Sequence, residues 1–215
     1  MGIPVLIMGE SGSGKSASMR NCKGEEFGVF NVYGKPFPFK NTNNLKKLDN
    51  AGYNDIMRIL AKEKMKSYII DDSQYLMSFE MFDRVKEKGY EKFTELAVHF
   101  KTLIDFIVKN LSDDILVYFL HHIEKSDEGK LKAKTIGKML DEKITLEGLF
   151  SIVLYCENTE NTYKFITQGN GLTTAKSPMG MFDGEIDNDL VTVDNTIREY
   201  YELKSRTKTE KGEEK

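Results

Sequence analysis

The chain has little of what would tie it to an oxidising compartment or a membrane. Its 215 residues include only two cysteines, Cys22 and Cys156, without C-x-x-C spacing or a nearby histidine set, so neither a disulfide framework nor a zinc site is expected. No apolar run approaches the ~18 residues of a membrane span, and no charged-then-apolar leader opens the chain. Met1-Gly2 does not begin a myristoylation motif, because Leu6 stands where Ser or Thr is required. We therefore expect a cytoplasmic protein without a membrane partner.

The chain also lacks a strong excess of either charge. It carries 31 lysines and arginines against 34 acids, for a net charge of -3, which excludes the bulk basicity of a histone-like binder. Contact with a polyanion would need a local patch. With 40% hydrophobic residues, the chain can bury one core, so we expect one domain over residues 1–203. Residues 204–215 are wholly polar and are predicted to be a disordered tail.

A glycine-rich stretch follows the first apolar run directly. Residues 3–8 have the composition of a short buried strand, residues 16–20 can open a helix, and the stretch between them matches G-x-x-x-x-G-K-[ST] at every fixed position. Strand, loop and helix in this order predict a phosphate-binding loop. Its candidate nucleotide-binding residues are Gly9, Glu10, Ser11, Gly12, Ser13, Gly14, Lys15, Ser16 and Ala17.

Such a loop binds through its backbone. Glycines allow successive N–H groups to turn toward phosphate oxygens, and the helix N-terminus adds the positive end of its dipole. Lys15 is predicted to reach the β and γ phosphates as a catalytic cation, and the Ser16 hydroxyl to hold Mg²⁺. The alternative is a Gly/Ser-rich turn that happens to contain a lysine, but the surrounding strand and helix patterns favour the phosphate loop.

Two aspartates end a second buried strand, at residues 68–72. This pattern resembles the Walker B element, in which Asp71 would orient the Mg²⁺ shell and Asp72 would act as the catalytic base that polarises the attacking water. The alternative is an acidic turn that caps the following helix. A whole strand at 27–33 separates the two motifs, which favours the additional-strand class of P-loop ATPases over small-molecule kinases.

Further elements follow from periodicity. A helix at 93–110 carries an apolar stripe, with His99 off that stripe and expected in solvent. A short helix and a mobile loop around Gly89 are expected within 78–92. The remaining predicted strands are 27–33, 115–120, 149–156 and 162–167, and the remaining helices are 55–65 and 195–203.

Histidines and lysines follow the strand at 115–120. His121 and His122 stand where a polar sensor would contact a γ phosphate, and His122 is the candidate, although a histidine pair at a wet strand end explains the pattern equally well. A turn signal at 126–129 predicts a hairpin, and its alternating lysines could contact a phosphate backbone. The residues alone favour an ordinary solvated hairpin, because acids offset much of the charge. The candidate DNA contacts are Lys130, Lys132 and Lys134.

The loop at 168–178 has few core-forming residues. Lys176 is the side chain in it that could reach a phosphate, across a subunit boundary as an arginine finger does, and it is the fourth catalytic candidate.

Four stretches together resemble a family of small bacteriophage ATP-binding proteins similar to the ATPase core of RecA. The likeness spans about residues 3–200. Some members of the family are single-strand annealing recombinases that bind single-stranded DNA. The stretches are the loop at 9–16, Tyr-Ile-Ile-Asp-Asp-Ser-Gln-Tyr from 68, Thr-Ile-Gly-Lys-Met-Leu-Asp-Glu-Lys from 135, and Thr-Ala-Lys-Ser-Pro-Met-Gly-Met-Phe from 174.

The resemblance implies a RecA-like, mostly parallel central sheet flanked by helices, with ATP and Mg²⁺ at the carboxyl ends of its strands. It implies single-stranded DNA as a partner along loops 78–91 and 123–143, self-assembly into a ring or filament, and a phage or host single-strand binding protein as a further partner. In a phage-encoded protein the compartment would be the host cytoplasm. One departure is that Asn31, Val32 and Tyr33 stand where RecA has its catalytic glutamate, which leaves Asp72 as the obvious base and predicts slow hydrolysis.

Two other functions stay open. The chain could be an ATPase switch or motor that acts on a protein partner without binding DNA. A small-molecule kinase is disfavoured by the inserted strand and by the scattered arginines, which form no lid-like cluster.

Overall fold

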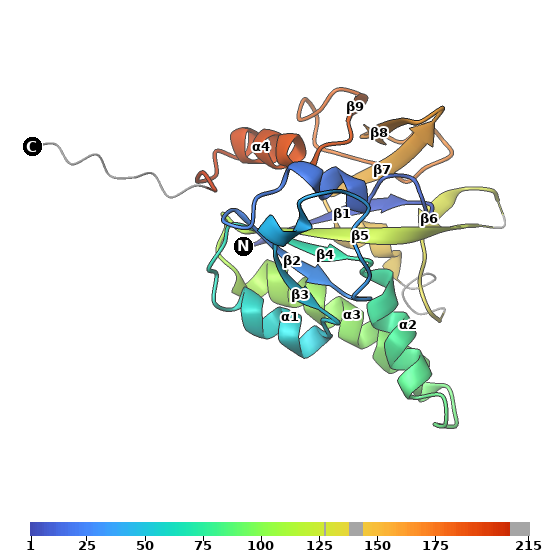
Figure 1. The fold of residues 1–215 in the computed structure, drawn as a ribbon. Helices are drawn as coiled ribbons and strands as arrows, with labels where there is room; N and C mark the ends of the chain where they lie inside the picture. The colour runs from blue at the N-terminus through green and yellow to red at the C-terminus, as the bar shows by residue number, and fades with distance from the viewer. Residues whose placement is uncertain (127, 138–143, 207–215) are drawn as a thin grey trace, which may run out of the picture.

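The chain folds around one large sheet (Figure 1). The structure is a computed structural model that describes residues 1–126, 128–137 and 144–206. The sheet order is β3-β2-β4-β5-β1-β7-β8-β9, with β6 paired to the far end of β5. The strands are β1 (Ile3–Gly9), β2 (Phe27–Asn31), β3 (Lys46–Asp49), β4 (Ser67–Asp71), β5 (Leu116–Lys125), β6 (Leu131–Ala133), β7 (Ile152–Thr159), β8 (Thr162–Ile166) and β9 (Glu185–Asp187).

Six neighbouring strands, from β3 across to β7, run parallel, whereas β8, β9 and β6 pair antiparallel. Both faces of the parallel part are covered, which is why β1, β2 and β4 are apolar almost throughout rather than alternating. β5 lies between β1 and β4. The fold is therefore α/β with a large, mostly parallel central sheet.

Helices cover the two faces unequally. On one face lie α1 (Tyr53–Leu60), α2 (Gln74–Asp83) and α3 (Glu91–Asn110), and on the other lie the short 3₁₀ helix η1 (Ser16–Asn21) and α4 (Leu190–Tyr200) (Figure 1). The predicted stripe of α3 is buried against the sheet, as the amphipathic pattern requires. None of the helices in the described part of the chain has the length and apolar character needed to cross a membrane.

Several elements differ from the sequence prediction. β3 and β9 were not expected, because short edge strands carry no hydrophobic run. The segment after the glycine-rich loop is a 3₁₀ helix that ends at Asn21, where the Ser18 hydroxyl donates to the Lys15 carbonyl at 2.6 Å and competes with regular helical bonding. β5 continues to Lys125, so the two histidines lie within a strand rather than after it. α1 ends at Leu60, five residues before the predicted end.

The predicted hairpin is present. Ile123 to Lys125 of β5 pairs antiparallel with β6, and the Lys130 carbonyl accepts from the Ser126 N–H across the turn. Lys138 and Lys143, most of the stretch that begins at Thr135, and residues 207–215 of the expected tail lie outside the described residues.

A buried ionic network joins α4 to the amino ends of β4 and β5. Asp194 is fully buried and accepts from Ser67 Oγ at 2.5 Å, Tyr118 Oη at 3.0 Å and Arg198 Nε at 2.6 Å. Arg206, which composition assigned to the tail, also packs here, 2.8 Å from Asp194 Oδ1. One carboxylate thus accepts from four donors and holds α4 and Arg206 against the sheet.

Removing that charge should destabilise the fold strongly. We expect Asp194→Asn to lower the free energy of unfolding by about 3–5 kcal/mol, because two guanidinium groups lose their buried partner. Urea unfolding followed by circular dichroism measures the change. Asp105→Asn is the control, since its pairs with Lys101 and Lys109 lie at the surface and each contributes at most about 1 kcal/mol. Equal losses in both variants would contradict the role of the network.

Candidate functional site

The predicted site residues meet at the carboxyl edge of the parallel strands. The glycine loop, which is residues 9–16, follows β1, and Asp71 ends β4. His122 of β5 lies between them, in register with Gly9. In open α/β sheets this edge is where ligands bind.

Two glycines of the loop cannot be replaced by a residue with a side chain unless neighbouring atoms move. A Cβ on Gly9 would lie 2.7 Å from the Cys156 carbonyl oxygen, and one on Gly14 would lie 2.6 Å from the Tyr163 ring. Gly14 also has a φ of +102°, which other residues rarely adopt. The motif's glycines are therefore demanded by packing against β7 and β8 as well as by the turn.

The loop has unused donors. None of the described residues accepts a hydrogen bond from the backbone N–H of Gly12, Gly14 or Lys15. Consecutive free N–H groups around residues of positive φ form a concave anion-binding surface. These N–H groups can thus receive an anion without giving up a hydrogen bond.

Lys15 is folded back onto the loop. Its ammonium donates to the Gly9 carbonyl at 2.8 Å and to the Glu10 carbonyl at 2.7 Å, and the side chain is buried. Burial lowers the pKa of Lys15 to about 8, although the nearby carboxylates Asp72 and Asp71 favour the charged form. A phosphate at the loop would offer this ammonium a stronger acceptor than a carbonyl.

β7 and the segment before α4 support the loop from behind. The Cys156 thiol donates to the Ser13 carbonyl at 3.0 Å, and Asn188 Nδ2 donates to Cys156 Sγ at 3.1 Å. Burial raises the pKa of Cys156 to about 11, so the thiol keeps its proton and serves as a donor. Both cysteines are free, as the sequence predicted.

Ser16 and Asp71 form the central contact. Ser16 Oγ donates to Asp71 Oδ1 at 2.7 Å, joining positions 55 residues apart. The other oxygen, Oδ2, is buried without a hydrogen-bond partner in the described part of the chain. Burial, reinforced by the neighbouring Asp72 charge, raises the pKa of Asp71 to about 6. A buried carboxylate with an unused oxygen is poised to bind a cation.

This pair fits Mg²⁺. A hydroxyl and a carboxylate are hard oxygen ligands, and Mg²⁺ commonly takes one or two such protein ligands and fills its remaining positions with water and phosphate. No group of three or more His, Cys, Asp or Glu side chains suited to a metal occurs among the described residues, which disfavours an all-protein cage.

Asp72 lies just past β4 in a left-handed conformation, with a φ of +59°, which aspartate tolerates better than most residues. Its Oδ2 lies 2.5 Å from the Lys35 ammonium, and its Oδ1 lies 3.2 Å from His122 Nε2. Burial by itself would raise the pKa of Asp72. The hydrogen bonds from His122 and Lys35 outweigh this effect and hold the pKa below its usual value. Both oxygens of the predicted base are therefore engaged.

The two histidines have different surroundings. His121 is fully buried, and its Nε2 donates to the Lys134 carbonyl at 2.8 Å while its Nδ1 lies 2.9 Å from Ser73 Oγ. Burial lowers the pKa of His121 to about 4, so it stays neutral and structural. His122 faces Asp72 instead and packs edge-on against the Tyr75 ring. Of the pair, only His122 reaches the predicted base.

Lys35 was missed by sequence reasoning. The turn that carries it is built by Asn31, whose Nδ2 donates to the Lys35 carbonyl at 2.9 Å and whose Oδ1 accepts from the Gly34 N–H at 3.0 Å. Asn31, at the end of β2, thus positions a cation beside Asp72. A lysine shortly after a buried strand, at the edge shared with Asp72, was the available signal.

The remaining candidates lie apart from this cluster. The Lys176 backbone pairs with Val153, at the level of Leu6 in β1, and no described residue forms an ion pair with its side chain. In the hairpin, Lys132 lies 3.5 Å from Glu124 and Lys130 lies 3.6 Å from Glu128, while Lys134 is exposed. Within one chain, neither group joins the glycine loop.

Comparison with known proteins adds no assignment: no family model matches the sequence, and no curated protein matches it.

Removing the Lys35 charge should raise the pKa of Asp72. Because that pKa lies below its ordinary 3.8, the ionised carboxylate contributes stability above this value and loses it as the pH falls through the folded-state pKa. Lys35 is partly exposed, so we expect Lys35→Met to be less stable by about 1 kcal/mol at pH 7. The difference should shrink as the pH falls below the ordinary pKa of Asp72 and vanish once Asp72 is protonated in the folded state as well.

Urea unfolding over a pH series measures this loss. Lys62→Met, at an exposed position outside the ion pairs that Asp72 forms with Lys35 and His122, controls for the loss of a surface charge. A difference between Lys35→Met and the wild type that persists unchanged at low pH would show that Lys35 acts through packing alone.

Proposed function

We propose that this chain is a RecA-like P-loop protein of the bacteriophage type that binds ATP with Mg²⁺, hydrolyses it slowly and binds single-stranded DNA to promote annealing or recombination. The observation that carries the nucleotide part is the contact between Ser16 and Asp71 beside a loop in which three N–H groups have no acceptor among the described residues. The placement of β5 between β1 and β4 agrees with the additional-strand class.

Each residue has a role in the proposed ATP complex. The loop N–H groups would cradle phosphate oxygens, and the Lys15 ammonium would leave the Gly9 and Glu10 carbonyls for the β and γ phosphates. Ser16 and Asp71 would hold Mg²⁺, which neutralises phosphate charge during the transfer. A hollow of about 360 Å³ between the loop and the end of β7 adjoins this site.

Hydrolysis would depend on Asp72. To accept a proton from a water that attacks the γ phosphorus, as the bond to the bridging oxygen breaks, the carboxylate must release a partner. Lys35 is the more exposed of the two partners and would be the one to move, because His122 is more deeply buried. His122, as the predicted sensor, would then lie between the γ phosphate and Asp72 and contact both. The double engagement of Asp72 is the physical reason to expect slow turnover.

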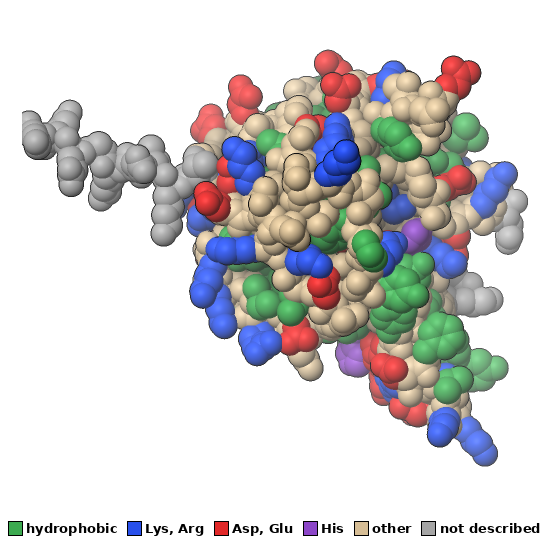
Figure 2. All heavy atoms as spheres, in the orientation of Figure 1, with side chains coloured by type: hydrophobic (Ala, Val, Ile, Leu, Met, Phe, Trp, Pro, Cys, Tyr) green, Lys and Arg blue, Asp and Glu red, His purple; other side chains and the backbone are tan. Residues whose placement is uncertain are grey.

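In the DNA part of the proposal, the strand would contact an arm, residues 82–90, formed by the end of α2 and the turn before α3. Hydrophobic side chains gather over the α2 side of the molecule in Figure 2, and Phe82, Val85 and Tyr90 are mostly exposed. Exposed aromatic rings are stacking platforms for unpaired bases. This arm coincides with the loop expected to line a DNA path, and the hairpin lysines would supply the phosphate contacts.

Assembly of several copies would complete the site. Lys176 has no partner at its own glycine loop, and a ring or filament would bring it to the nucleotide of a neighbouring copy, as proposed for an arginine finger. A phage or host single-strand binding protein would be a further partner.

A second candidate function keeps the nucleotide and removes the DNA. The pairing of Lys130 and Lys132 with glutamates favours it, because those lysines already have counter-charges. The exposed apolar arm would then contact a protein whose affinity depends on the bound nucleotide.

The nucleotide proposal is tested by Lys15→Ala. Because the variant loses charge-assisted contacts to phosphate, we expect its dissociation constant for MgATP to rise about 100-fold. Isothermal titration calorimetry measures the affinity, with the exposed Lys64→Ala as the matched control. Wild-type affinity in Lys15→Ala would refute the site.

Fluorescence anisotropy with a labelled, unstructured single-stranded DNA tests the DNA proposal. We expect MgATP to strengthen binding, and replacement of Lys130, Lys132 and Lys134 by Gln to weaken it and to reduce the slope of log affinity against log salt by about 2. Gln at the exposed Lys46, Lys62 and Lys64 removes the same charge elsewhere and should change little. Absence of binding by the wild type at low salt would favour the protein-partner function.

A further inference from the structure

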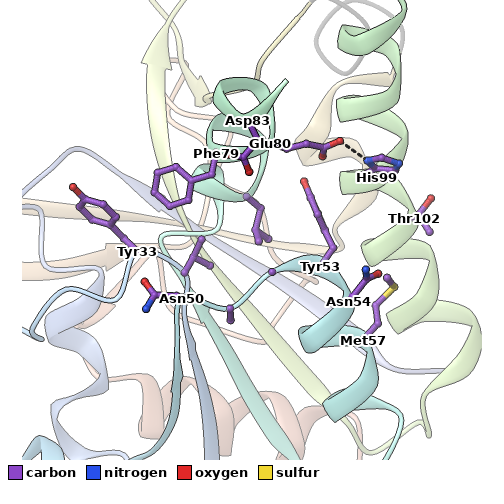
Figure 3. Close-up of a pocket in the computed structure, with 14 residues that line it drawn as sticks. Tyr33, Asn50, Tyr53, Asn54, Met57, Phe79, Glu80, Asp83, His99 and Thr102 are labelled. Atoms are coloured by element: carbon purple, nitrogen blue, oxygen red, sulfur yellow. Dashed lines mark hydrogen bonds and ion pairs between the residues drawn. The ribbon is translucent and has the colours of Figure 1, made fainter. Parts of the chain in front are cut away.

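A second hollow lies apart from the glycine loop. A cavity of about 670 Å³ lies among the ends of β2 and β3, the start of α1, and facing parts of α2 and α3 (Figure 3). This volume is typical of sites for small organic ligands. The cavity shares no lining residue with the glycine loop or with the Asp71 and Asp72 pair.

Its inner wall holds buried polar atoms that lack partners. The Tyr53 hydroxyl and Glu80 Oε2 are both buried, and neither has a hydrogen-bond partner in the described part of the chain. Figure 3 shows the Tyr53 hydroxyl directed toward Glu80 and His99. Leaving such groups unpaired costs about 1–3 kcal/mol each, so they favour a ligand that can bind them.

The Glu80 carboxylate is fixed in place by its other oxygen. Oε1 accepts from His99 Nδ1 at 2.7 Å and from Arg84 Nη1 at 3.2 Å. Arg84 is shared with Glu87 and Glu95, so its charge is divided among three carboxylates. Oε2 therefore remains available as an acceptor on a rigid group.

Charge selects the class of ligand. Glu80 and Asp83 line the cavity, and its described lining contains no lysine or arginine. A phosphate or carboxylate would meet two acids and no lysine or arginine in this lining, so neither ATP nor a nucleic-acid backbone suits this cavity.

Aromatic rings form the outer wall. Tyr33, which is 55% exposed, and Phe79 lie with their ring centroids 5.5 Å apart, and both line the cavity. These rings would cover an alkyl stem together with the apolar side chains of Val32, Leu76 and Met57.

We propose that this cavity binds an organic cation, namely a guanidinium or primary ammonium group on an apolar stem, with the charged head at Glu80 Oε2 and the Tyr53 hydroxyl and the stem against the Tyr33 and Phe79 side. The same chemistry is offered by a free alkyl cation and by the lysine or arginine side chain of a second copy of this chain. The inference does not depend on nucleotide binding.

Calorimetry with butylguanidinium tests the proposal, and neutral butylurea of the same shape is the ligand control. At a protein concentration where the chain is monomeric, we expect saturable binding of butylguanidinium and at least ~10-fold weaker binding of butylurea. Lys15→Ala should bind butylguanidinium like the wild type. This result would keep the proposal distinct from the nucleotide site. Equal binding of the two ligands, or no saturable binding, would overturn the proposal.

Two variants locate the head group. Glu80→Gln should weaken butylguanidinium at least ~10-fold, and Tyr53→Phe should weaken it less, because a neutral contact is lost. Glu95→Gln is the matched control, since Glu95 pairs with the same Arg84 but does not line the cavity. Circular dichroism checks that the variants are folded. If Glu80→Gln does not fold, Tyr53→Phe still tests the proposal. Unchanged affinity in folded Glu80→Gln, or in Tyr53→Phe where Glu80→Gln does not fold, would overturn the assignment.

Sedimentation velocity distinguishes the two sources of the cation. If a neighbouring copy supplies the cation, butylguanidinium should reduce self-association of the wild type. The Glu80→Gln variant should then self-associate less than the wild type. If a free cation is the ligand, butylguanidinium should bind while the sedimentation coefficient stays unchanged.

Discussion

The hydrogen bond from Ser16 to Asp71 is the contact on which the arrangement of this edge depends. It joins the segment after β1 to the end of β4, across the intervening β5, and it forms because the parallel strands β1 and β4 end at nearly the same level on the two sides of β5. The strands are apolar on both faces, so polar groups can gather only where they end. Asp71 is consequently ionisable yet buried, and its pKa is raised to about 6. Such a carboxylate is a strong cation ligand, which gives this edge its chemistry.

Around that bond, the chain's own cations stand near its acids. Lys15 and Lys35 each favour the ionised forms of Asp71 and Asp72. Lys15 contacts two carbonyls, and Lys35 contacts Asp72. A bound triphosphate could take the place of these acceptors. In that case nucleotide binding would rearrange charge at the site without a large movement of the backbone.

A line of aromatic contacts leads from this edge to the second cavity. His122 packs edge-on against Tyr75, which stacks on Phe79 with centroids 5.4 Å apart, and Phe79 lines the cavity. Under the two proposals, the first site would bind an anion and the second a cation, although both border the same end of the sheet. Their opposite charge would let each reject the other's ligand.

The sequence by itself determined the α/β class, the strand that precedes the glycine loop, the buried stripe of α3 and the acidic end of β4, because each depends on local periodicity or on adjacent residues. It did not reveal β3 and β9, whose few residues pair only because a neighbouring strand offers its edge. Nor did it reveal the pairing of Lys35 with Asp72, the separate surroundings of His121 and His122, or the cavity at Glu80. Those features join residues far apart in sequence, and only tertiary packing decides which of them meet, since burial and charge act through space rather than along the chain.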